Sequence, residues 1–374
     1  MRAFPGVANA AASAAHRADA ALRERYAARG SPPPQALDWN DYDALVEALA
    51  AGLGDAPAMH SFTYEHPVRL QDFDVGVGKP YPVRLAYSDP GGGGEPLIAI
   101  GGLTNVAQRF DFLALDAAPA LRVIGLDLAG RGRSGWLAEL SDYHLETYVE
   151  QLRQLMEHLD LPSCSLLGSS LGGTTAIRFA ARYPKRVHRI VLNDSSPHIP
   201  AKRRARRAKA VARHYVFRTP AEVFRRTGAA EKHAGPAPDS VLLHSAHHRT
   251  RWSDEEAGRV YRHDLRALLA YRAEARSSLD MWDDWARVRC PVLLIHGVES
   301  DATSVETIAR MRGFDRLSVI HVPATGHTPT LSDGLLIDEV ARWVCDDRPF
   351  DEDRTQPTAD WPKRVLYPDD RRSL

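Results

Sequence analysis

A serine, a histidine and several carboxylates occupy positions that could form a nucleophilic catalytic centre. Residues 168–172, Gly-Ser-Ser-Leu-Gly, match the pattern GxSxG with Ser170 at the centre. An apolar run at 165–167 precedes the motif, and a helical pattern follows it as far as Pro184. A serine on a tight turn between strand and helix projects its hydroxyl from the sheet, while the helix N-terminus offers N–H groups to an oxyanion. We therefore predict that Ser170 is a nucleophile.

A serine hydroxyl needs a base to take its proton and an acid to orient that base. His327 follows the apolar run at 318–322, and Asp301 follows the run at 292–295. The chain order serine, acid, histidine predicts His327 as the base and Asp301 as the acid. Two other carboxylates remain open for the acid: Glu299 in the same loop, and Asp194 after the run at 189–192.

The first apolar run of the series, at 97–100, is followed by Gly101, Gly102 and Leu103. A loop in this position can supply a backbone N–H to the oxyanion, and the residue after the nucleophile supplies a second. We predict the N–H groups of Leu103 and Leu171 as the two donors; packing alone is the alternative role for the glycine pair. This chemistry requires no metal and no organic cofactor.

Short apolar runs alternate with helical patterns through much of the chain. The runs lie at 97–100, 122–126, 165–167, 189–192, 292–295 and 318–322. Leu145, Tyr148, Val149, Leu152 and Leu155 recur at helical spacing between two of them. Continuous apolar strands separated by helices predict an α/β protein with a mostly parallel sheet covered on both faces.

The alternation divides the chain into five segments. Residues 61–195 and 286–346 form the two parts of the core, and residues 196–285, which lack a buried-strand run, form an inserted set of helices. Residues 1–60 are a helical extension, and residues 347–374 are a polar tail in which Trp361 and Tyr367 could anchor the chain.

Two of these segments have roles that the sequence leaves open. In the extension we expect helices at 8–29 and 41–53, the second capped by Asn40. They could form a structural appendage, an oligomer contact or a lid over the active site. The insertion begins with a basic stretch, 202–226, which is either a solvated helix face or a binding surface for an anionic substrate or partner.

The composition limits the classes of protein to which the chain can belong. Its 374 residues are 44% hydrophobic and 26% charged, as expected of a globular protein. Lysine plus arginine equals aspartate plus glutamate at 48 each, so no overall charge favours nucleic acid or anionic lipid. No apolar run approaches the roughly 20 residues that span a bilayer. Three scattered cysteines, Cys164, Cys290 and Cys345, predict neither a disulfide framework nor a zinc site and favour the cytoplasm.

The ordered motifs resemble those of the α/β-hydrolase fold superfamily over roughly residues 62–346. The matching segments are GGLTN, DLAGRGRSGW, GSSLGG, LNDSSP, HGVESD and GHTPTL. The resemblance is moderately specific to the branch of esterases, lactonases and carbon–carbon bond hydrolases. It implies Ser170 as nucleophile, His327 as base and Asp301 as orienting acid, with residues 196–285 as a helical cap over the pocket.

The activity that follows is hydrolysis of a small-molecule carboxylic ester or lactone through an acyl-enzyme on Ser170. Three alternatives remain: hydrolysis of a carbon–carbon bond in a vinylogous diketone, acyl transfer or lyase chemistry on the same triad, and a non-catalytic receptor built on the fold.

Overall fold

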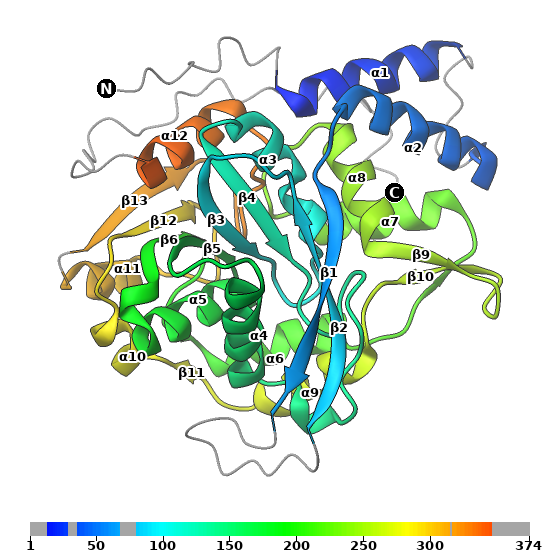
Figure 1. Ribbon diagram of the computed structural model, residues 1–374. Helices are drawn as coiled ribbons and strands as arrows, with labels where there is room; N and C mark the ends of the chain where they lie inside the picture. Colours follow the sequence, from blue (N-terminus) through cyan, green and yellow to red (C-terminus); the bar gives the residue numbers. More distant parts are fainter. Residues whose placement is uncertain (1–12, 29–35, 68–79, 315, 346–374) are drawn as a thin grey trace.

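The central element of the protein is a sheet of eight strands (Figure 1). The computed structural model describes residues 13–28, 36–67, 80–314 and 316–345. The strands lie in the order β1-β2-β4-β3-β5-β6-β12-β13. β2 is antiparallel to both of its neighbours, and the strands from β4 to β13 are parallel. Their bounds are β1 Ala58–His66, β2 Tyr81–Asp89, β3 Glu95–Ile100, β4 Leu121–Leu126, β5 Cys164–Ser169, β6 Val187–Asn193, β12 Val292–Gly297 and β13 Leu317–Val322.

Both faces of the sheet are buried beneath helices. In β3, Leu97 and Ala99 belong to one apolar cluster, and Ile98 and Ile100 belong to the other. The first cluster includes α3 (Asp111–Ala117) and α12 (Gly334–Cys345); the second includes α4 (Leu145–His158), α5 (Leu171–Arg182), α10 (Trp282–Arg287) and α11 (Val305–Arg312). Successive side chains of a strand point to opposite faces, so a doubly covered sheet requires continuous apolar runs. The predicted α/β architecture is confirmed.

Two N-terminal helices, α1 (Ala14–Ala28) and α2 (Trp39–Leu53), pack against each other and against α8 (Asp239–Arg249). The backbone N–H of Ser240 donates to Asp19 at 2.8 Å, which fixes α8 against α1. The expected Asn40 cap is wrong: α2 begins two residues earlier than predicted, and Asp38 caps it through a reciprocal pair of hydrogen bonds with Asp41. The extension packs on its own chain, and none of its described residues lines the pocket described below.

The insertion between β6 and β12 contains helices and short strands. The helices are α6 (Ala201–Val211), α7 (Pro220–Glu231), α8, α9 (Leu265–Glu274) and α10, the last of which packs against the core. The strands β8 (Val216–Phe217), β10 (Gly258–Tyr261) and β9 (Thr250–Ser253) form an antiparallel sheet, and β7 (His198–Ile199) pairs with β11 (Leu279–Asp280). The prediction that the insertion contains helices alone is therefore incomplete. The sequence did not indicate these strands because segments of two to four residues are too short to show a periodic pattern.

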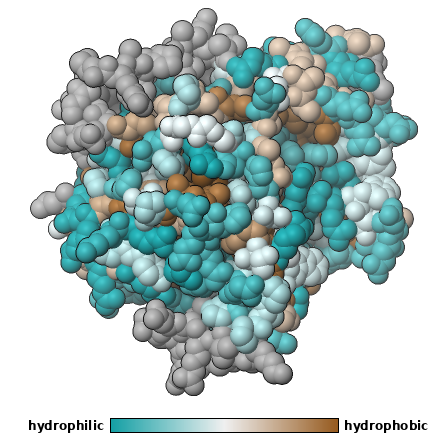
Figure 2. Space-filling view, viewed as in Figure 1, coloured by the Kyte–Doolittle hydropathy of each residue, from teal (hydrophilic) through white to brown (hydrophobic). Residues whose placement is uncertain are grey.

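The surface on the side shown in Figure 1 is mostly hydrophilic, with small, separate hydrophobic patches (Figure 2). None of the described helices has the length and apolarity needed to cross a bilayer. The predicted anchors Trp361 and Tyr367, and the start of the first predicted helix, lie outside the described residues.

Candidate active site

Ser170 occupies a strained turn between β5 and α5. Its backbone has φ 53° and ψ −110°, a conformation that residues with a side chain rarely adopt. Close packing holds this turn: a Cβ atom at Gly168 would lie 2.4 Å from the carbonyl oxygen of Gly172, and one at Gly173 would lie 2.3 Å from the side chain of Ser195. Such a turn exposes a side chain at the end of the sheet, as a strand–serine–helix motif requires.

Gly172 lets α5 approach the end of β3, and its replacement by alanine should destabilise the protein. A Cβ atom there would lie 2.0 Å from the carbonyl oxygen of Ile100, which is backbone and cannot rotate away. We expect Gly172→Ala to lower the free energy of unfolding by about 1–3 kcal/mol, measured by denaturant titration.

Gly228 provides the matched control for this substitution. It lies within α7, and a Cβ atom there would have no heavy atom within 4 Å. Gly228→Ala should raise the free energy of unfolding by about 0.5–1 kcal/mol, because alanine favours the helix. Equal stability of Gly172→Ala and the parent protein would contradict the packing described here.

His327 lies on the loop after β13, and its imidazole contacts Asp194. Nδ1 of His327 lies 2.8 Å from Oδ2 of Asp194, a carboxylate with no exposed surface. Asp194 directly follows β6; its N–H donates to the carbonyl of Ile295 on β12, and the hydroxyl of Ser300 donates to Oδ2 at 2.5 Å. Because an ionised carboxylate only accepts hydrogen bonds, Nδ1 carries the proton of the neutral ring and Nε2 is left as the acceptor.

Asp301, the acid predicted to orient His327, makes no hydrogen bond to the imidazole in this structure. The side chain of Asp301 is 51% exposed and turns toward α6, where its carboxylate pairs with Arg203 at 3.1 Å and with Arg206. Two guanidinium groups attract this carboxylate to the surface. Glu299 is also exposed, and its N–H donates to the carbonyl of Thr325. Of the three carboxylates weighed from the sequence, Asp194 is the one beside the imidazole.

Ser170 and His327 line one pocket together with Leu103 and Leu171. Among the described residues no hydrogen bond joins the Ser170 hydroxyl to His327, and catalytic hydrogen bonds commonly tighten only when substrate is bound. Leu171 is the first residue of α5, where a backbone N–H has no partner within the helix. Both predicted oxyanion donors thus belong to residues at the pocket wall.

Two residues that the sequence analysis did not single out hold these loops in place. Arg131 is buried, and its Nε donates to the carbonyl of Leu103 at 3.1 Å. Asn193 donates to the hydroxyl of Ser169 at 3.1 Å and to the carbonyl of Pro329 at 2.9 Å, which ties the serine strand to the histidine loop. Both lie in segments used for the resemblance, DLAGRGRSGW and LNDSSP, but only the fold reveals their contacts.

The pocket lies between the core and the insertion. Its insertion side includes Arg203, Arg204 and Arg207 of α6 and Tyr271 of α9. The segment that precedes α8 also supports the histidine loop, because the N–H of Gly326 donates to the carbonyl of His233 at 2.7 Å. The insertion therefore covers the pocket and positions one of its loops.

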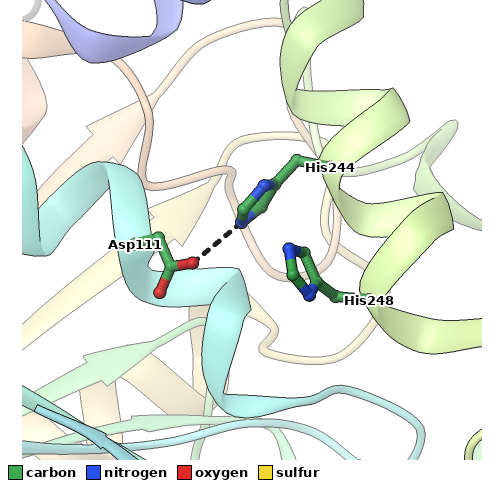
Figure 3. Close-up of side chains that lie close together, drawn as sticks. All are labelled: Asp111, His244 and His248. Atoms are coloured by element: carbon green, nitrogen blue, oxygen red, sulfur yellow. Dashed lines mark hydrogen bonds and ion pairs between the residues drawn. The ribbon is translucent and has the colours of Figure 1, made fainter. Parts of the chain in front are cut away.

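A cluster of Asp111, His244 and His248 lies where α3 meets α8 (Figure 3). Nε2 of His244 is 3.0 Å from both the carbonyl of Gln108 and Oδ2 of Asp111. A carbonyl only accepts, so this nitrogen carries a proton and cannot bind a metal in that state. Burial, then the neighbouring His244 and His247, then Arg133 and Arg262, lower the pKa of His248. The two arginines would also repel a metal ion. We interpret the cluster as a polar contact between insertion and core.

Comparison with known proteins gives the same fold. The chain is 28% identical over 261 residues to a 3-hydroxybutyrate-oligomer hydrolase of Cupriavidus necator, covering 67% of this chain and 89% of that protein. It is 28% identical over 232 residues to an (E)-2-((N-methylformamido)methylene)succinate hydrolase of Acinetobacter baylyi, covering 61% and 81%. A solved α/β hydrolase of Novosphingobium aromaticivorans superimposes with a TM-score of 0.63 at 22% identity, over 78% of this chain and 99% of that one.

The family model described as the alpha/beta hydrolase fold matches residues 95–333, which is more than half of the chain. The matched range includes β3 with its glycine loop, the turn at Ser170, the insertion and the His327 loop. The chain belongs to the α/β-hydrolase fold family.

Proposed function

We propose that the protein is a serine hydrolase that cleaves a carboxylic ester or lactone through an acyl-enzyme on Ser170. One observation carries the proposal: in the pocket that Ser170 lines, the imidazole of His327 is held through Nδ1 by the buried carboxylate of Asp194. A histidine held in this way presents Nε2 as a base to a neighbouring hydroxyl. Asp194 replaces Asp301 as the orienting acid in this proposal.

The reaction begins when Nε2 of His327 takes the proton of Ser170 and the serine oxygen attacks the substrate carbonyl. The bond from carbonyl carbon to leaving oxygen then breaks, and the imidazolium returns the proton to the departing alcohol. A water attacks the acyl-enzyme, with His327 again taking and returning a proton. Asp194 keeps the ring in one tautomer and stabilises its charged form.

The tetrahedral intermediates carry a negative oxygen, which we assign to the N–H groups of Leu103 and Leu171. Support comes from the position of Leu171 at the start of α5, where N–H groups and the helix dipole favour an anion. The hydrogen bond from Arg131 to the Leu103 carbonyl limits rotation of the Leu103–Thr104 peptide group and so helps to keep the loop in place. Preorganised donors of this kind commonly contribute about 10²–10³ in rate each.

The substrate class and the compartment belong to the same proposal. The similarity to an enzyme that hydrolyses 3-hydroxybutyrate oligomers favours an ester over the other substrates considered. Cys164, Cys290 and Cys345 are free thiols, as expected in the reducing cytoplasm.

The discriminating experiment compares simple aryl esters with a vinylogous ring-cleavage diketone as substrates of the purified protein. We expect turnover of the esters and release of the free acid. Turnover of the diketone alone would replace ester hydrolysis by carbon–carbon bond hydrolysis. Ester formation on addition of an alcohol, at the expense of the free acid, would indicate an acyltransferase.

The pH dependence of kcat/KM should show that the pKa of His327 is lowered. Burial lowers the pKa of this imidazole below its ordinary 6.5, and the charge of Arg203 lowers it further. The hydrogen bond to Asp194 raises the pKa but does not outweigh burial. The base must be neutral, so a lowered pKa keeps it active to lower pH. We expect the acid limb of kcat/KM for an aryl ester to lie below pH 6.5. A limb at or above 6.5 would contradict this assignment.

A further inference from the structure

Three arginines of the basic stretch turn toward the reaction pocket. Arg203, Arg204 and Arg207 of α6 line the same pocket as Ser170 and His327. Arg203 and Arg207 are four residues apart, so they lie on one face of the helix. Arg206, on the same helix, is 68% exposed and does not line the pocket. The stretch therefore has a solvated side and a side that faces the site of reaction.

Two of the three guanidinium groups are already neutralised by carboxylates of the protein. Arg203 pairs with Asp301 at 3.1 Å. Arg204 pairs with Glu274 at 3.5 Å, and it also donates to the carbonyls of Glu274 and Ser277. These contacts explain how α6 is held over the pocket, and they leave neither side chain in need of a ligand.

Arg207 differs from both neighbours. Within the described ranges, no carboxylate lies at ion-pair distance from its guanidinium, and no hydrogen bond to it is present. Glu231 is near enough to interact electrostatically, but it is held by Arg109 at 3.1 Å and by Arg249 at 2.9 Å. Burial, then the charges of Arg249 and Arg203, lower the pKa of Arg207, as expected for a cation that the protein itself does not compensate.

A half-buried cation without a counter-ion is costly unless a ligand supplies the charge. We infer that Arg207 binds a carboxylate carried by the substrate whose ester carbonyl lies at Ser170. This inference rests on the proposed function and adds the substrate class: esters or lactones with a free acid group. A planar guanidinium matches a carboxylate with two parallel hydrogen bonds. Glu274 in the pocket wall and Glu231 nearby would oppose a dianionic phosphate more strongly than a single carboxylate.

The test uses two matched pairs of esters. With the acid on the acyl side, mono-p-nitrophenyl glutarate is compared with p-nitrophenyl pentanoate; with the acid on the leaving group, 4-acetoxybenzoate is compared with phenyl acetate. We expect Arg207→Gln to lower kcat/KM for at least one anionic ester by about 10- to 100-fold, mainly through KM, because a hydrogen-bonded charge is lost. The neutral partner should change by less than about threefold.

Two further variants control for charge and folding. Arg206→Gln removes one charge from the exposed side of the same helix and should leave the preference for the anionic ester unchanged. Arg207→Lys keeps the charge without the planar fork and should give an intermediate loss. Turnover of the neutral ester by each variant shows that the pocket is folded.

Binding of glutarate to Ser170→Ala protein, measured by calorimetry, makes the test independent of turnover. Arg207-dependent glutarate binding would support the inference even if none of the four esters reacted. Hydrolysis of the neutral esters with no effect of Arg207→Gln on either anionic ester, and no Arg207-dependent glutarate binding, would overturn it and leave the proposed hydrolase intact. Failure of Ser170 to react with a fluorophosphonate would contradict the proposed function itself.

Discussion

Ser170→Ala should lower kcat for an aryl ester by about six orders of magnitude, to the residual rate provided by the oxyanion donors and substrate binding. His327→Ala should cost about as much, and the double variant should be no slower than either single variant. The reason is that a nucleophile without its base, or a base without its nucleophile, cannot carry out the first step. Steady-state and single-turnover kinetics on the purified variants measure the effect.

The neighbouring Ser169 offers a matched control. Its hydroxyl accepts a hydrogen bond from Asn193 and has no exposed surface, so Ser169→Ala removes a serine from the same motif without removing the nucleophile. We expect a loss of at most about tenfold, the value of one neutral hydrogen bond. A larger loss for Ser169→Ala than for Ser170→Ala would show that the nucleophile had been assigned to the wrong serine.

Asp194→Asn should lower kcat by about four orders of magnitude. Asparagine keeps the shape of the side chain, but its amide can donate to Nδ1 and so favour the tautomer in which Nε2 carries the proton and cannot act as a base. Asp194 has no exposed surface, so bulk water does not reach its carboxylate. The assay is turnover of the same ester, with circular dichroism to verify that the variant is folded.

Asp301→Asn is the direct comparison for this second prediction. Asp301 pairs with Arg203 and Arg206 and makes no hydrogen bond to His327, so Asp301→Asn should change kcat by no more than about fivefold. The opposite ranking, with a kcat far below the parent value for Asp301→Asn and close to it for Asp194→Asn, would support the prediction from the sequence that Asp301 is the orienting acid.

The core of the fold could be predicted because its signals are local and repeated. Each of the six apolar runs lies within a strand of the parallel part of the sheet, since strands covered on both faces must be apolar throughout. The GxSxG turn could be placed for the same reason: strand, serine and helix are consecutive in the sequence. The short strands β8, β9 and β10 could not be predicted, because pairing between distant segments, not local pattern, produces them.

The acid of the site could not be chosen from the sequence. Asp194 and Asp301 both follow parallel strands whose carboxyl ends meet at one edge of the sheet, so chain order admits either. The choice depends on the positive φ of 47° at Asp194, which helps to direct its side chain toward His327, and on the α6 arginines that attract Asp301. Both are tertiary effects.

The nucleophilic role of Ser170 is tested most directly by mass spectrometry of the intact protein after reaction with a fluorophosphonate. We expect one covalent adduct, located on the peptide that contains Ser170 and absent from Ser170→Ala. An adduct on another residue, or an unmodified protein under conditions that label a known serine hydrolase to completion, would contradict it.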